Sequence, residues 1–302
     1  MDQNLQKYQA FITTVDCGSF TKAAEILGYA QSFVSKMIAD LEAEWKVVLL
    51  ERSRAGVQLT SDGMAMLPCA RELLNSYRRV QEQAASLSGV MTGLIRIGTF
   101  SSVAAHWMPP IIQRFQEDYP GVRYELLLGD YGEIEQWIFE GRVDCGFLRL
   151  PTKAEYETIS LGKDEYVAVL PAGHPLTRKD LLRPQDLDAQ PFMLLEHGGK
   201  TEVSELLEKY RVKPDIRFTT WDDYAILSMV ESGLGIGVLP RLILRRIPYR
   251  VEIRSFTEPF FREIGLARKS GVASSVAVRR FIRYLQYREK GHSRDSSSFL
   301  PE

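Results

Sequence analysis

The feature that most constrains this chain is a pair of short helical segments near its N-terminus. Residues 19–27 and 31–45 both read as helices, and Gly28 lies in the short turn between them. Two short helices joined by a tight glycine turn are the sequence form of a helix-turn-helix, whose second helix is shaped to enter the major groove of DNA. Since the chain has 302 residues, a far larger part of it must fold into something else.

The second of these helices has two different faces. Val34, Ile38 and Leu41 repeat at helical spacing and form its buried side. The opposite side, near the start of the helix, carries polar side chains that can pair with bases or phosphates. These side chains are Gln31, Ser32, Ser35 and Lys36.

A β-hairpin is predicted directly after the helices. Two short apolar segments flank an Arg-Ala-Gly turn at residues 54–56, and Arg52 and Arg54 lie near its tip. A hairpin in this position is a wing, and its arginines are well placed for backbone phosphates. The local charge does not favour DNA, because residues 1–60 carry six Lys and Arg side chains against seven Asp and Glu. A small helical module with solvated charges is therefore the alternative at this point.

Longer ordered motifs over the same residues resemble the LysR-type transcriptional regulators. They read Gly18-Ser19-Phe20-Thr21-Lys22-Ala23-Ala24-Glu25, Gln31-x-x-x-Ser35-Lys36, Leu50-Glu51-Arg52-Ser53 and Leu59-Thr60-x-x-Gly63. The resemblance implies an all-α winged helix-turn-helix domain over residues 1–60. It also implies that the polar side chains of the second helix face DNA, and that Arg52 and Arg54 contact phosphates.

Three positions depart from the family pattern. Ala30 stands where a serine usually opens the recognition helix, and the loss of a serine cap costs about 1 kcal/mol. Phe33 occupies a position where a small residue is common, so it would either meet a thymine methyl group or require local repacking. Lys46 replaces a common glycine. These departures change the expected base preference and leave the expected fold unchanged.

A long helix with an apolar stripe is predicted over residues 61–88, followed by a hinge, so that residues 61–91 form a linker. Thr60 can cap this helix, and Pro68 would kink a free helix at a cost of about 3 kcal/mol. The stripe consists of Met64, Leu67, Leu74 and Tyr77, with Val80 and Ala84 as further candidates. The resemblance implies that the helix pairs with a second chain in a homodimer or homotetramer. The stripe alone fits packing on its own chain equally well.

Strand-like and helical runs alternate from Leu94 onward, which predicts an α/β architecture with mostly parallel sheets. The resemblance continues here and implies an effector domain over residues 92–290, built like a periplasmic binding protein. Its two subdomains would span 92–162 with 269–290, and 163–268, with a small-molecule effector between them. Residues 291–302 are expected to be a disordered tail.

Ligands of such sheets bind where strands end and helices begin. The first strand runs into Thr99, Ser101 and Ser102, a later strand ends at Arg149, and Thr201 follows another. Each hydroxyl has the alternative of serving only as a helix cap. Arg149 would favour an anionic effector if it lies in the cleft, and it would otherwise be a structural salt-bridge residue.

Other chemistries find no support in the sequence. There is no GxSxG elbow, the four histidines share no metal-ligand spacing, and the three cysteines form no CxxC pair. Some regulators of this family sense oxidants through paired cysteines, but Cys145 is predicted to pack as a small hydrophobe. We therefore expect no catalytic residue, no metal and no cofactor. With no membrane-length apolar run and no signal-peptide pattern, we expect a cytoplasmic protein.

These observations predict a sequence-specific, DNA-binding transcriptional regulator that responds to a small-molecule effector. Its expected partners are double-stranded DNA, the effector and further copies of itself. Three alternatives stay open: an enzyme on an α/β scaffold, a solute-binding protein, and a regulator that has lost DNA binding and acts through partner proteins.

Overall fold

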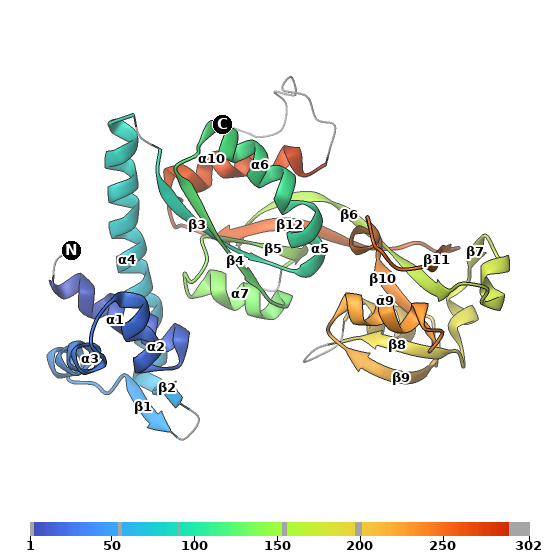
Figure 1. Cartoon of the computed structure of the whole chain (residues 1–302), viewed down its shortest axis with the longest axis horizontal. Coiled ribbons are helices and arrows are strands. Elements are labelled where there is room, and N and C mark those ends of the chain that lie inside the picture. The colour runs from blue at the N-terminus through green and yellow to red at the C-terminus, as the bar shows by residue number, and fades with distance from the viewer. Residues whose placement is uncertain (1–2, 54–55, 90, 153–155, 197–200, 290–302) are drawn as a thin grey trace.

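The structure is a computed structural model that describes residues 3–53, 56–89, 91–152, 156–196 and 201–289. Its N-terminal part consists of three helices and a small hairpin, which lead into one long helix (Figure 1). These elements are α1 (Gln3–Cys17), α2 (Phe20–Leu27), α3 (Gln31–Trp45), β1 (Leu50–Ser53), β2 (Gly56–Leu59) and α4 (Ser61–Leu87).

The helix-turn-helix forms as the sequence predicts. Ser19 caps α2 by accepting a hydrogen bond from the Lys22 amide, and Gly28 ends that helix with φ of 70°, a value that suits glycine. Ala30 precedes α3 in an extended conformation and provides no side-chain cap. The predicted inner face of α3 is buried in a core that it shares with α1 and with the first turns of α4.

Helix α4 begins against the hairpin and is long. The hydroxyl of Thr60 accepts a hydrogen bond from the Gly63 amide at 2.9 Å. A Cβ atom on Gly63 would lie 2.1 Å from the Leu49 carbonyl oxygen, so only glycine permits this close approach. Pro68 lies within the helix, which continues to Leu87 and confirms the predicted long helix.

The remaining elements form a mixed α/β region in which the η segments are short 3₁₀ helices. They are β3 (Gly93–Thr99), α5 (Ser101–His106), α6 (Met108–Asp118), β4 (Val122–Leu128), α7 (Tyr131–Phe139), β5 (Cys145–Leu150), β6 (Tyr156–Pro171), η1 (Pro175–Arg178), β7 (Leu181–Leu182), η2 (Pro184–Leu187), β8 (Pro191–Leu195), α8 (Glu202–Lys209), β9 (Asp215–Thr220), α9 (Asp223–Glu231), β10 (Ile236–Pro240), η3 (Arg241–Leu244), β11 (Val251–Phe256), β12 (Phe260–Lys269), α10 (Val276–Tyr284) and η4 (Leu285–Arg288).

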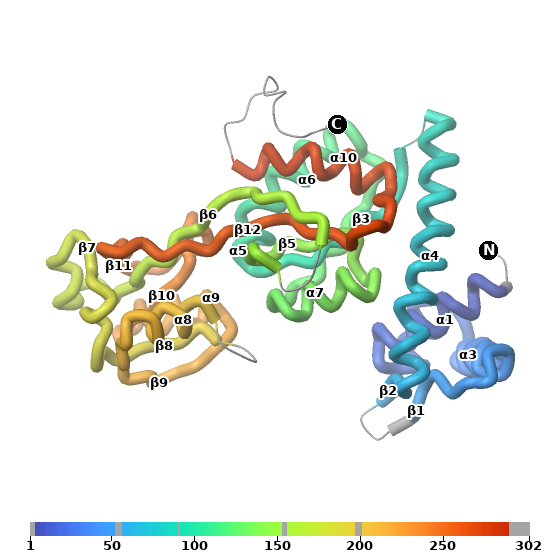
Figure 2. The backbone as a smooth tube through the Cα atoms, turned by 180° about the vertical axis from the view of Figure 1, so that it is seen from behind, coloured from blue at the N-terminus to red at the C-terminus, as the bar shows by residue number. Residues whose placement is uncertain are grey.

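One sheet runs through the whole α/β region in the order β4-β3-β5-β12-β6-β10-β8-β9, with β11 beside β6. Its two ends are parallel, but β12 is antiparallel to β5 and to β6, and β10 is antiparallel to β6. The prediction of mostly parallel sheets is therefore wrong for the middle of the sheet. The reason is that β6 and β12 are long strands that run from one half of the region to the other (Figures 1 and 2).

Separate hydrophobic cores lie toward the two ends of these long strands. One core surrounds Phe115, Phe147 and Phe281, and β12 contributes Ile264 and Leu266 to it. Two further clusters fill the other half, one between β8, β10 and α8 and one beneath α9. The two halves are thus joined by two strands and can each keep a core of their own. No helix in the described residues combines the length and the apolar character that crossing a membrane requires.

Candidate functional site

The start of helix α3 presents an exposed polar and aromatic surface. Gln31, Ser32 and Lys36 are exposed, and Ser35 is half-buried. Phe33 is 46% exposed, and its ring lies edge-on to that of Tyr29 at a centroid distance of 5.3 Å. All of the predicted base-reading side chains therefore share one end of α3, while the opposite side of the helix faces the core.

The wing packs directly on the helix-turn-helix. The Val57 amide in β2 donates a hydrogen bond to the Gly18 carbonyl at 3.1 Å, in the turn between α1 and α2. The main chain of Arg52 lies in β1, where it pairs with Val57. The side chain of Arg52, and Arg54 as a whole, lie outside the described residues. The described contact of the hairpin with the helices is thus made at the turn that precedes α2.

A cavity of about 500 Å³ opens between the two halves of the α/β region. Its walls come from α5, α7 and β5 on one side and from α8 and α9 on the other, with β12 between them. Four of the five predicted effector residues line it, namely Ser101, Ser102, Arg149 and Thr201. Thr99 is fully buried at the end of β3 and is not among the lining residues.

Arg149 spans this cavity in a two-pronged ion pair. Its Nη1 and Nη2 atoms donate to Oε1 and Oε2 of Glu205 at 2.9 and 2.7 Å, which links β5 to α8. These hydrogen bonds raise the pKa of Arg149 and lower that of Glu205. The Arg149 Nε atom also lies 3.8 Å from Glu202. The sequence predicts that Arg149 either binds an anionic effector or forms a structural salt bridge. The contacts show the salt bridge, and this salt bridge crosses the cleft.

A second cation, Arg262 of β12, is buried in the floor of the cleft. Its Nε and Nη2 atoms donate to Asp164 at 3.0 and 2.7 Å, and Nη2 also donates to the Ser102 hydroxyl at 2.7 Å. Its Nη1 atom donates to the Tyr131 hydroxyl at 3.1 Å, and the guanidinium lies 4.9 Å from the centroid of the Phe100 ring. Ser102 is therefore engaged by Arg262, and Phe100 occupies the cap position of α5 instead.

The cleft hydroxyls differ in their roles. Thr201 donates to the Leu195 carbonyl at 2.9 Å and precedes α8 without capping it through its side chain. Ser101 is exposed at the start of α5. The alternative that these residues act only as helix caps therefore finds no hydrogen bond to support it at Ser102 or Thr201.

Two family models match the chain and together cover most of it. The helical part over residues 5–64 matches "Bacterial regulatory helix-turn-helix protein, lysR family", and residues 88–289 match "LysR substrate binding domain". The chain belongs to the LysR family. That family consists of transcriptional regulators and not of enzymes.

Individual LysR-family proteins match over nearly the full length. An uncharacterized regulator, YvbU of Bacillus subtilis, is 32% identical over 281 residues, which are 92% of this chain and 96% of YvbU. A full-length OxyR variant from Pseudomonas aeruginosa has a TM-score of 0.74 at 23% identity, with 94% of each chain covered. Full-length CbnR in complex with its target DNA has a TM-score of 0.66 at 19% identity, with 94% of this chain and 99% of CbnR covered. The two structures show the same fold.

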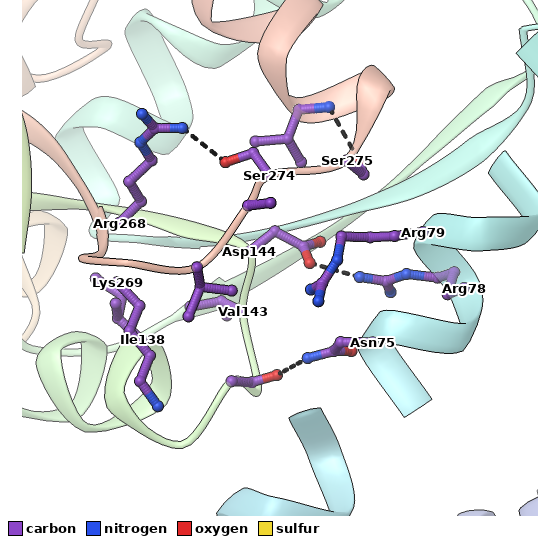
Figure 3. Close-up of a pocket in the computed structure, with 14 residues that line it drawn as sticks. Asn75, Arg78, Arg79, Ile138, Val143, Asp144, Arg268, Lys269, Ser274 and Ser275 are labelled. Carbon is purple, nitrogen blue, oxygen red and sulfur yellow. Dashed lines mark hydrogen bonds and ion pairs between the residues drawn. The ribbon is translucent and has the colours of Figure 1, made fainter. Parts of the chain in front are cut away.

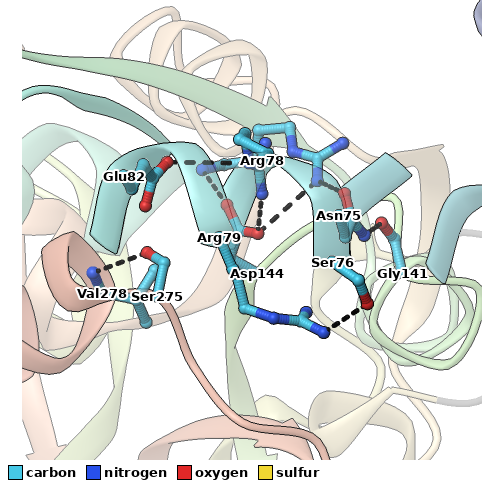
Figure 4. Close-up of polar contacts among 10 residues, drawn as sticks. Asn75, Ser76, Arg78, Arg79, Glu82, Gly141, Asp144, Ser275 and Val278 are labelled. Atoms are coloured by element: carbon cyan, nitrogen blue, oxygen red, sulfur yellow. Dashed lines mark hydrogen bonds and ion pairs between the residues drawn. The ribbon is translucent and has the colours of Figure 1, made fainter. Parts of the chain in front are cut away.

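In this LysR-family chain, helix α4 contacts both the helix-turn-helix part and the α/β part. The buried guanidinium of Arg71 donates to Asp16 of α1 at 2.5 Å and also to Glu140 at the end of α7. Further along α4, Arg78 pairs with Asp144 at 2.5 Å, and Asn75 donates to the Gly141 carbonyl at 2.9 Å (Figure 4). We call these contacts the α4 joint. A cavity of about 60 Å³ lies beside it, lined by Arg79 and Ser274 among others (Figure 3).

The cysteine prediction is confirmed where the structure tests it. Cys145 is fully buried in the first core of the α/β region, and burial raises the pKa of its thiol. A buried thiol with a raised pKa is poorly suited to react as a thiolate. In the described part of the chain, no group of three or more His, Cys, Asp and Glu side chains is placed to hold a metal ion.

Proposed function

We propose that this LysR-family regulator binds specific DNA sequences through α3 and the wing, and that a small molecule in the cleft controls this binding. The main support is that a single helix, α4, contacts both the helix-turn-helix part and the α/β part that contains the cleft. It does so through ion pairs of the buried Arg71. The arrangement fits a sensor whose input and output domains are mechanically linked. We place the protein in the cytoplasm, with the DNA that it would bind.

The DNA contacts that we propose start from the exposed end of α3. Glutamine can pair with adenine and lysine with guanine or phosphate, which gives Gln31 and Lys36 the leading roles in base reading. Ser32 and Ser35 would contact bases or phosphates, and Arg52 and Arg54 phosphates. The exposed ring of Phe33 would lie against a thymine methyl group. The fold shared with CbnR, which was solved with its target DNA, supports this use of the domain.

A second copy of the chain is the partner that we propose for α4. Five side chains, mostly exposed, follow one another on this helix at alternating spacings of four and three residues, the pattern of a two-stranded helical seam. This seam consists of Leu73, Tyr77, Val80, Ala84 and Leu87. Leu73, Val80 and Leu87 are 44%, 67% and 81% exposed, which leaves their apolar surface for another chain to cover. Pairing along this seam would give a homodimer with two recognition helices, and dimers of this kind would give a homotetramer.

The effector would act by changing how the two halves around the cleft are arranged. Ser101, Ser102, Arg149 and Thr201 would line its site, with Thr99 supporting the end of β3 beneath it. A ligand that binds one arrangement better than the other shifts the population toward it. The α4 joint, through Arg71 in particular, would carry that shift from α7 to α1.

Binding of the intact chain to the DNA upstream of its own gene tests the proposal. We expect Gln31→Ala and Lys36→Ala each to weaken binding by about 5- to 150-fold, since one good base contact contributes about 1–3 kcal/mol. Lys209→Ala, an exposed lysine of α8, is the matched control and should bind like the unmodified chain. Equal binding by all four proteins would show that α3 does not read DNA and would favour action through partner proteins.

A further inference from the structure

We propose that the effector of this chain carries a protonated amine, which the buried carboxylates of Glu202 and Asp223 bind inside the cleft. The inference rests on the proposed function, because it assigns a chemical class to the ligand of the same cleft. It departs from the anionic effector that Arg149 suggests when the sequence is considered alone.

The charged side chains of the cleft are mostly acidic. Among its described lining residues, the carboxylates outnumber the guanidinium groups by five to two. The carboxylates belong to Asp130, Glu135, Glu202, Glu205 and Asp223, and the guanidiniums to Arg149 and Arg262. A cavity with this balance attracts cations and repels anions before any contact is made.

Both guanidinium groups already have carboxylate partners of their own. Arg149 is held by both oxygens of Glu205, and Arg262 by Asp164, which is also buried. An anionic effector would have to replace one of these carboxylates at its arginine. Replacing one partner by another of the same charge gains little net binding free energy, because the displaced carboxylate must then find a new partner.

Two of the carboxylates that line the cleft, in contrast, each have one buried oxygen that accepts no hydrogen bond from the described residues. These are Oε1 of Glu202 and Oδ1 of Asp223, and the two residues are only 5% and 9% exposed. Burying an acceptor without a partner is costly, and burying a charged one is more so. Burial also raises the pKa of Asp223 to about 6. A cationic donor that enters the cleft would relieve this cost at both residues.

In the described part of the chain, no neighbouring group donates a hydrogen bond to either of these two oxygens. Asp222 caps α9 through hydrogen bonds to the Tyr224 and Ala225 amides, so the cap does not require Asp223. The nearest cation to Glu202 is Arg149, whose Nε lies 3.8 Å from Oε1, beyond hydrogen-bonding distance. Aromatic rings of Phe100, Tyr131 and Trp221 also line the cavity and suit the methylene groups and the positive charge of an alkylamine.

The test is a titration of the intact chain with matched cations and anions. Thermal unfolding and calorimetric titration at neutral pH would compare putrescine and cadaverine with succinate and glutarate, which have the same carbon chain lengths. We expect at least one diamine to bind and to raise Tm with increasing concentration, while the dicarboxylates do not. Glu202→Gln and Asp223→Asn, which keep the side-chain shape, should each weaken diamine binding by at least about tenfold.

Glu208→Gln is the matched control, because Glu208 lies on the same helix as Glu202 but is exposed and outside the cavity. Diamine binding that is equal in the Glu202, Asp223 and Glu208 variants would overturn the proposal. So would binding of a dicarboxylate only, or the absence of diamine binding. The titration contains no DNA, so its failure is separate from that of DNA binding by α3, which the Gln31 and Lys36 variants test.

Discussion

At the scale of single residues, Asp223 shows which part of the cleft a sequence pattern can and cannot reveal. Predicting ligand residues at the ends of strands led to Ser102 and Arg149, and the same rule applies to Asp222 and Asp223 at the end of β9. Nothing in the sequence tells which of two adjacent aspartates caps the helix and which is buried. The sequence gives even less indication that Arg262 is buried in the cleft, because a charged residue in a strand is ordinarily expected to be exposed.

The raised pKa of Asp223 makes a prediction for stability. Desolvation raises this pKa from 3.8 to about 6, with Arg262 opposing the shift and Asp222 and Asp164 adding to it. A carboxyl group with a raised pKa binds its proton more tightly in the folded state. Its ionised form therefore destabilises the fold, by an amount that grows as the pH rises from about 4 to about 6 and is complete above that range.

We therefore expect Asp223→Asn to raise the free energy of unfolding at pH 8 by at most about 3 kcal/mol, the equivalent of about two pKa units. Below pH 4 the two proteins should differ little, since the wild-type carboxyl group is then protonated. Urea denaturation of both proteins across this pH range measures the difference. A gain in stability that is the same at pH 4 and pH 8 would contradict the assignment of a buried, ionised Asp223.

At the scale of elements, α3 and α4 show how far periodicity alone can be followed. The buried face of α3 and its uncapped start at Ala30 follow the pattern in the sequence. The apolar residues predicted as one stripe on α4 lie on two different faces of that helix. Leu67 packs into the helix-turn-helix core, whereas Leu73, which the stripe omits, is exposed and belongs to the proposed seam with Val80. A long helix that serves two neighbours has two apolar faces, and periodicity does not say which neighbour takes which face.

The seam on α4 predicts the oligomeric state. Val80→Glu would place a charge at the middle of the proposed interface, and we expect the variant to dissociate toward monomers in sedimentation equilibrium. Met64→Glu is the control, because Met64 is exposed to a similar degree on the same helix but falls outside the seam. If both variants keep the same mass as the wild type, α4 does not pair through this face.

At the scale of the whole molecule, the alternating pattern of the sequence predicts an α/β fold but does not predict the two strands that unite it. The sequence predicts a strand over only residues 166–171 of β6, and it predicts no strand over β12. Glu157, Lys163 and Arg262 interrupt their apolar pattern. The strands form because of partners distant in sequence: β6 pairs with β12, β10 and β11. These two strands also connect the two halves of the α/β region on either side of the cleft.

We propose that the arrangement of this cleft sets the DNA affinity of α3. The Arg149–Glu205 ion pair allows a test of this coupling without any ligand. Glu205→Arg would place two cations opposite each other across the cleft and force it open, and Glu208→Arg makes the same change of charge on an exposed site of α8. The measurement is the Kd of each intact protein for the DNA upstream of its own gene. We predict that Glu205→Arg changes this Kd by at least about fivefold, the low end of typical coupling between sites, while Glu208→Arg leaves it unchanged. Equal affinities for both variants and the wild type would contradict the claim.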